Sequence, residues 1–116
     1  HGTEHFANAA YSQMENTLRF LGWENTYVAT VEGFPELSYV MARLEGKDIR
    51  TLHLLPFMIV AGDHAENDLA GPEEDSWQNQ LKRQGYEVKV HLKGLGQFEK
   101  VGDIFADHLQ QAKELD

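Results

Sequence analysis

Three residues whose side chains can bind a metal ion lie where the sequence indicates that a strand has ended: His1, Glu32 and His64. His64 follows the apolar run 54–61, Glu32 directly follows the β-branched segment 26–31, and His1 opens a glycine-containing segment typical of a strand exit. Two imidazoles and a carboxylate suit a borderline divalent ion such as cobalt, nickel, iron or zinc. Three protein ligands would leave coordination positions open, as in a catalytic metal site.

Each of these residues also has a structural interpretation, which the spacing alone leaves open. His64 can be a turn residue whose imidazole hydrogen-bonds the backbone, Glu32 a solvated turn acid, and His1 a disordered chain end. A neutral histidine also accepts protons near physiological pH, so the same imidazoles can serve as bases. We expect the histidines inside predicted strands or on the inner side of the last predicted helix to be structural: His53, His91 and His108.

The composition removes several classes of function. The 19 acidic residues against 10 basic ones give a net charge of -9, which argues against nucleic acid or an anionic membrane surface as partner. No apolar run approaches the roughly 20 residues of a membrane-spanning helix. The absence of cysteine excludes disulfides, iron–sulfur clusters and thiol nucleophiles.

Apolar periodicity and turn residues predict alternating helices and strands. Helices are expected over about residues 4–21, from Leu37 to Leu44, from a cap at Asp75 or Ser76 to Gly85, and after the turn Gly94-Leu95-Gly96. Strands are expected over residues 26–31, 49–57 and 86–92, the second with both faces covered, and a polar loop over 63–71.

This alternation predicts βαβ units, and therefore an α/β fold with a parallel sheet flanked by helices on both faces. We expect one domain over residues 1–116, with a further strand before His1. Ligands of open parallel sheets bind beyond the carboxyl ends of the strands. His1, Glu32 and His64 are therefore expected at one edge of the sheet.

Several segments together resemble one known family. They are His1-Gly2-Thr3-x-His5 with Ala7-Asn8, Thr30-Val31-Glu32-Gly33-x-Pro35, Leu55-Pro56-Phe57-Met58-Ile59-Val60-Ala61-Gly62-Asp63-His64-Ala65-x-Asn67-Asp68, Ser76-Trp77 and Gly94-Leu95-Gly96. In this pattern the chain resembles the C-terminal half of anaerobic sirohydrochlorin cobaltochelatases of the CbiK type.

The resemblance implies a class II chelatase fold, in which two similar α/β domains face each other across a cleft that admits a tetrapyrrole. It implies that His1, Glu32 and His64 are the metal ligands, with His1 and His64 as the catalytic groups. The implied reaction inserts Co²⁺ into sirohydrochlorin without ATP, on the route to cobalamin. Other divalent ions such as Ni²⁺, Fe²⁺ or Zn²⁺ are alternatives.

The resemblance also implies that the chain is the C-terminal domain of a longer chelatase and is inactive without its N-terminal domain. We expect a cytoplasmic location, with the periplasm as the alternative, and the oligomeric state stays open, a homo-oligomer included. Two alternative hypotheses use the same fold: a non-catalytic haem- or metal-binding protein for storage or delivery, and a regulatory α/β domain without activity. Because this half is strongly acidic, we expect a substrate rich in carboxylates to be held by backbone amides or by the N-terminal half, or the negative charge to favour delivery of the cation instead.

Overall fold

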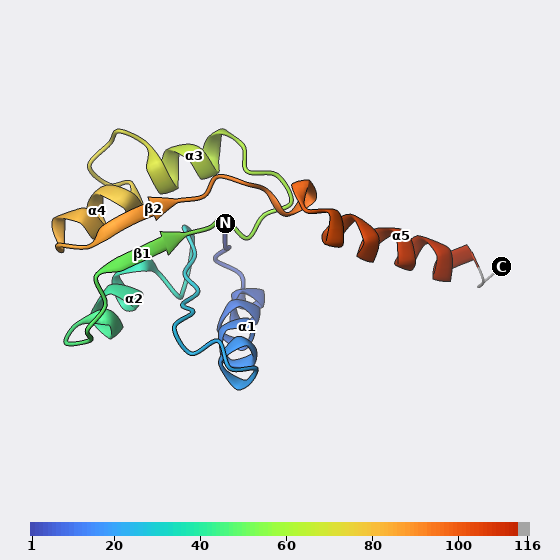
Figure 1. The fold of residues 1–116 in the computed structure, drawn as a ribbon, viewed down its shortest axis with the longest axis horizontal. Coiled ribbons are helices and arrows are strands. Elements are labelled where there is room, and N and C mark those ends of the chain that lie inside the picture. The colour runs from blue at the N-terminus through green and yellow to red at the C-terminus, as the bar shows by residue number, and fades with distance from the viewer. Residues whose placement is uncertain (114–116) are drawn as a thin grey trace. The chain divides into compact units, whose positions relative to one another are not determined.

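The computed structural model describes residues 1–113, which form several helices and two short strands (Figure 1). Glu87 donates its N–H to the carbonyl of Arg50 (2.9 Å), and His91 donates to that of Leu54 (2.9 Å), so the strands run parallel. This confirms the predicted α/β class. The elements are η1 Phe6–Asn8, α1 Ala9–Phe20, α2 Leu37–Leu44, β1 Thr51–Leu54, α3 Asp63–Ala70, α4 Trp77–Arg83, β2 Glu87–Val90, η2 Leu95–Gln97 and α5 Glu99–Lys113.

The chain forms two compact units. The first contains residues 1–52 together with 81–87, and the second contains residues 53–80 together with the chain from residue 88 onward. The prediction of one domain over residues 1–116 stays a prediction.

The first unit contains the predicted first two helices. α2 buries Leu37, Val40 and Leu44, which lie on one helical face. α1 ends before Gly22 and α2 before Gly46, and both glycines have positive φ (96° and 75°), as helix ends often require. The predicted helix over residues 4–21 is therefore confirmed in η1 and α1, and the second predicted helix in α2.

Glu15 of α1 is a buried carboxylate that joins three parts of this unit. Its oxygens accept hydrogen bonds from Arg43 of α2, from Arg19 Nε (3.1 Å) and from the backbone N–H of Val28 (2.8 Å). Burial raises the pKa of the Glu15 carboxyl, but the bonds from Arg43, Val28 and Arg19 outweigh it and hold this pKa below its usual value. The charged form of Glu15 is thus the form that the fold stabilises.

We expect Glu15→Gln to lower the free energy of unfolding by about 1–3 kcal/mol, since hydrogen bonds to a charged group contribute that much. Because the folded-state pKa is lowered, the stabilisation is full above the usual glutamate pKa of about 4.3 and is lost as pH falls through the folded value. Urea unfolding at several pH values checks this. The exposed Glu24→Gln is the control, and equal losses in the two variants would contradict the role of Glu15.

The prediction of a strand over residues 26–31 is wrong, because these residues form no strand in the structure. Its backbone hydrogen bonds do not go to a neighbouring strand: Val28 donates to the Glu15 side chain, Thr30 to the carbonyl of Pro35 (2.7 Å), and Val31 to that of His1 (3.0 Å). The β-branched composition predicted a strand, but a strand needs a ladder partner, which composition does not reveal.

The other two predicted strands exist but are shorter than expected. β1 covers four residues of the predicted 49–57 and β2 four of the predicted 86–92. The apolar run after β1 was expected to be covered on both faces. Leu55 and Phe57 are instead 63% and 61% exposed, so that expectation is wrong for the described residues.

The polar loop predicted over residues 63–71 is also wrong, because Asp63–Ala70 form helix α3. Ala65 and Leu69, four residues apart, are buried on one face of this helix. Asp63 and Glu66 lie in its first turn, where the helix dipole favours negative charge. The high polarity of the segment therefore reflects a solvated helix face.

The last two predicted helices are confirmed. The hydroxyl of Ser76 accepts a hydrogen bond from the N–H of Asn79 (3.4 Å) at the start of α4, as its predicted capping role requires. α5 follows the predicted glycine turn, but its expected inner face is exposed, including Phe105 (58%) and His108. The prediction of a packed His108 is therefore wrong. Within residues 1–113, no helix combines the length and apolar character needed to cross a bilayer.

Candidate metal-binding site

His1 and Glu32 are brought together by their backbones. Gly2 and Glu32 form a parallel β-bridge, and the carbonyl of His1 accepts hydrogen bonds from the N–H groups of Val31 (3.0 Å) and Glu32 (2.9 Å). Both His1 and Glu32 are exposed, so water and ions can reach their side chains. Two of the three predicted ligands are thus neighbours in one unit, although 31 positions (32 − 1) separate them in sequence.

Two glycines permit this close approach. Gly2 (φ +85°) and Gly33 (φ +76°) adopt a backbone conformation that other residues rarely adopt. A side chain on Gly2 would collide with the carbonyl of Glu32 and stand 2.6 Å from Thr30 Cβ. A side chain on Gly33 would collide with the carbonyl of Thr3. Glycine is therefore needed beside both His1 and Glu32, because a side chain at either position would prevent the two segments from approaching each other.

The buried amide of Asn8 connects the two segments. Its Oδ1 accepts a hydrogen bond from the N–H of Thr3 (2.9 Å). Its Nδ2 donates to the carbonyls of Glu32 (3.1 Å) and Phe34 (2.7 Å). Thr30, also buried, donates from its hydroxyl to the carbonyl of Pro35 (3.1 Å), which closes the same turn. One asparagine thus links the residues after His1 to the turn that carries Glu32.

His64 lies in the second unit, as the second residue of α3 after Gly62. The segment that leads to it is held by the Gly94-Leu95-Gly96 turn. Leu95 donates its N–H to the carbonyl of Met58 (2.7 Å), and Gly96 donates to that of Ile59 (2.9 Å). A Cβ on Gly94 would stand 2.6 Å from the same Ile59 oxygen, so only glycine allows the two segments to touch. His64 itself is exposed at the helix start.

The three predicted ligands therefore come from two units, with His1 and Glu32 in the first and His64 in the second. Inside either unit, the described residues contain no group of three or more histidine, aspartate or glutamate side chains that could hold a metal ion. Convergence of His1, Glu32 and His64 on one ion stays a prediction. The donor set, two imidazoles and a carboxylate, fits a borderline divalent cation.

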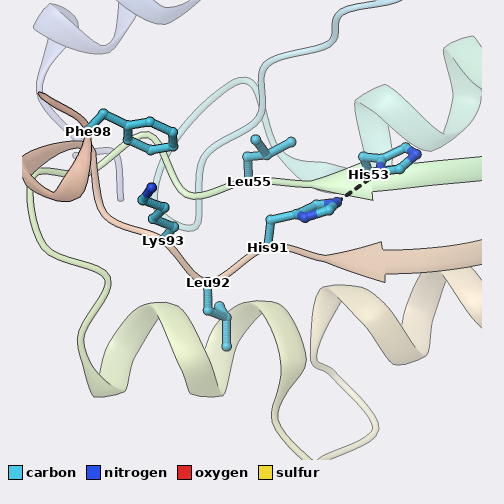
Figure 2. Close-up of a pocket in the computed structure, with 6 residues that line it drawn as sticks. All are labelled: His53, Leu55, His91, Leu92, Lys93 and Phe98. Atoms are coloured by element: carbon cyan, nitrogen blue, oxygen red, sulfur yellow. Dashed lines mark hydrogen bonds between the residues drawn. The ribbon is translucent and has the colours of Figure 1, made fainter. Parts of the chain in front are cut away.

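Two histidines that the sequence analysis interprets as structural, His53 and His91, form a close pair. His53 Nδ1 and His91 Nε2 are 2.8 Å apart in the second unit, and both side chains are exposed (Figure 2). His91 lies just beyond β2 rather than inside the predicted strand. The two histidines near strand ends were visible in the sequence, but the register that pairs them was not.

The site and the fold together define a small α/β domain that presents a paired histidine and glutamate. A protein-family model described as cobalt chelatase (CbiK) matches residues 1–114. The chain belongs to this family, as its sequence motifs predicted. It is 35% identical to the sirohydrochlorin cobaltochelatase of Salmonella typhimurium over 112 residues. This aligned segment covers 97% of this chain and 42% of that protein.

A second relative is the sirohydrochlorin cobaltochelatase CbiKC of Nitratidesulfovibrio vulgaris. The identity is 30% over 112 residues, covering 97% of this chain and 39% of the relative. The chain thus spans about two fifths of the length of the curated relatives that it matches.

We expect Asn8→Ala to lower the free energy of unfolding by about 2–4 kcal/mol, because it removes three part-buried hydrogen bonds and a fully buried group left without a partner costs about 1–3 kcal/mol. The N–H of Thr3 and the carbonyls of Glu32 and Phe34 are the groups affected. Urea unfolding measures the loss. Asn25→Ala, in an exposed loop, is the matched control. A loss below about 1 kcal/mol, or one no larger than in the control, would show that Asn8 does not hold these segments.

Proposed function

We propose that this chain forms the metal-binding part of a chelatase that inserts Co²⁺ into sirohydrochlorin. The observation that carries the proposal is the backbone pairing of His1 with Glu32, fixed by Gly2, Gly33 and Asn8. A metal substrate needs donors at fixed positions, and these two donors are positioned by buried contacts although their side chains face solvent. The family match over residues 1–114 supports cobalt as the substrate metal.

The chemistry requires a metal that is held and then released, together with acceptors for the two pyrrole protons that the ion displaces. Imidazoles suit both tasks, because neutral histidine binds a borderline ion through a lone pair and accepts a proton near neutral pH. In the proposal His1, Glu32 and His64 hold the incoming ion. His1 and His64 also act as proton acceptors.

We propose further that a second chelatase domain completes the site, so that the tetrapyrrole binds in a cleft between two domains. The chain covers only 42% and 39% of the length of its two relatives, which supports this arrangement. Physiological use of cobalt in preference to nickel, iron or zinc, and a cytoplasmic location, belong to the same proposal. A non-catalytic delivery protein is less well supported, because both relatives described above are named cobaltochelatases.

Metal binding tests the ligand set. We expect His64→Ala and Glu32→Gln each to weaken Co²⁺ binding by about a hundredfold, since loss of a partner behind a ligand already costs about 10–100-fold. Titration with Co²⁺, followed by the visible absorption of the bound ion, gives the affinities. His108→Ala removes an exposed histidine on α5 and should leave the affinity unchanged. A variant of His64 or Glu32 with the affinity of the parent chain would remove that residue from the site.

Metal insertion tests the reaction itself. Co²⁺ and sirohydrochlorin are mixed with the 116-residue chain or with the complete polypeptide, and the absorption spectrum reports metal entry. We expect the complete polypeptide to accelerate insertion and the chain alone to bind Co²⁺ without accelerating it. Binding of both substrates at the uncatalysed insertion rate would favour a delivery protein. Full activity of the chain alone would contradict the need for a second domain.

A further inference from the structure

We propose that an open pocket in the second unit binds a carboxylate-bearing edge of the tetrapyrrole, with Lys93 as the group that pairs with the carboxylate. This inference rests on the proposed function and addresses what that function leaves open. A substrate rich in carboxylates must find cationic partners on a chain whose net charge is -9.

The pocket has an unusual composition for this chain. It encloses about 580 Å³, and all of its lining residues belong to the second unit (Figure 2). Three of them carry nitrogen groups that can donate hydrogen bonds, three are apolar, and none is acidic, although acids outnumber bases almost two to one in the chain. The lining residues are His53, Leu55, His91, Leu92, Lys93 and Phe98.

Lys93 is positioned for an anionic ligand. Its ammonium lies 4.1 Å from the centre of the Phe98 ring, and the two side chains face each other in Figure 2. In the described part of the chain, no carboxylate forms an ion pair with this ammonium. A cation over an aromatic face is held in place yet keeps its hydrogens available to solvent or ligand.

The histidine pair supplies a second donor. The centres of the two rings are 5.1 Å apart and the rings are tilted by only 15°, so with a nitrogen–nitrogen distance of 2.8 Å they meet edge to edge. In a neutral pair, one ring donates the shared proton and the other accepts it. The accepting ring, His53 or His91, then carries its own proton on the outer nitrogen. That N–H can donate to a carboxylate in the pocket.

The remaining walls suit the apolar part of the same ligand. Leu55 is 63% exposed and Phe98 is 40% exposed, and both border the pocket. A ligand with an apolar ring system and charged edges can cover these side chains while its carboxylates meet the nitrogen groups. The pocket also lies at the carboxyl ends of β1 and β2, where ligands of parallel sheets bind.

Binding of metal-free uroporphyrin, a tetrapyrrole with carboxylates on every pyrrole ring, tests the pocket independently of metal insertion. We expect Lys93→Met to weaken binding to the full chain by about twofold to fivefold, as expected for one partly exposed ion pair. The salt dependence of the affinity should also decrease, because one charge contact is lost. Porphyrin absorption and fluorescence titrations at two salt concentrations provide both quantities.

Two further variants make the result specific. Lys100→Met removes another exposed lysine, on α5, and should leave the affinity unchanged, whereas Lys93→Arg retains the charge and should restore most of it. Unchanged binding in Lys93→Met, or an equal loss in Lys100→Met, would overturn the proposal.

The outcome is separable from that of the proposed function. Catalysed Co²⁺ insertion by the complete polypeptide with a KM for the tetrapyrrole unaffected by Lys93→Met would overturn the pocket and leave the function standing. Porphyrin binding that depends on Lys93, without catalysed insertion, would support the pocket and contradict the function.

Discussion

The buried amide of Asn8 is the interaction on which the predicted metal site depends most. The Asn8 side chain accepts a hydrogen bond from Thr3 and donates to the carbonyls of Glu32 and Phe34, and Gly2 and Gly33 let the backbones approach closely enough for these bonds to form. The positions of the two exposed donors, His1 and Glu32, are therefore set through their backbones. In the proposed function, a side chain that binds and releases an ion stays accessible to solvent, while buried neutral groups beneath it fix the position of its backbone.

The second unit uses close backbone contact in a similar way. The segment before His64 is held against the Gly94 turn by two backbone hydrogen bonds, without a charged or metal-binding group between them. Charge is also separated within the chain. Its excess of acids suits the attraction of a cation, whereas the pocket around Lys93 contains no acid and suits an anionic ligand. The proposed reaction between a cation and a polyanion would benefit from distinct sites for the two.

Much of the fold could be predicted from the sequence, because the helix faces of α1 and α2 and the cap at Ser76 are local patterns. The wrong predictions concern features that depend on contacts between residues distant in the sequence. Residues 26–31 have strand composition but their hydrogen-bond partners are a side chain and loop carbonyls. For the site, motifs indicated His1 and Glu32. The role of Asn8 and the pairing of His53 with His91 depend on which segments meet, which spacing does not encode.

The central claim is that His1, Glu32 and His64 bind one Co²⁺ ion. Anomalous diffraction at the cobalt absorption edge, from crystals grown with Co²⁺, tests it directly. The account predicts one anomalous peak within about 2.0–2.2 Å of a nitrogen of each histidine and an oxygen of Glu32, the range typical of such ligands. A peak coordinated by other residues, or one that contacts His1 and Glu32 but not His64, would contradict it.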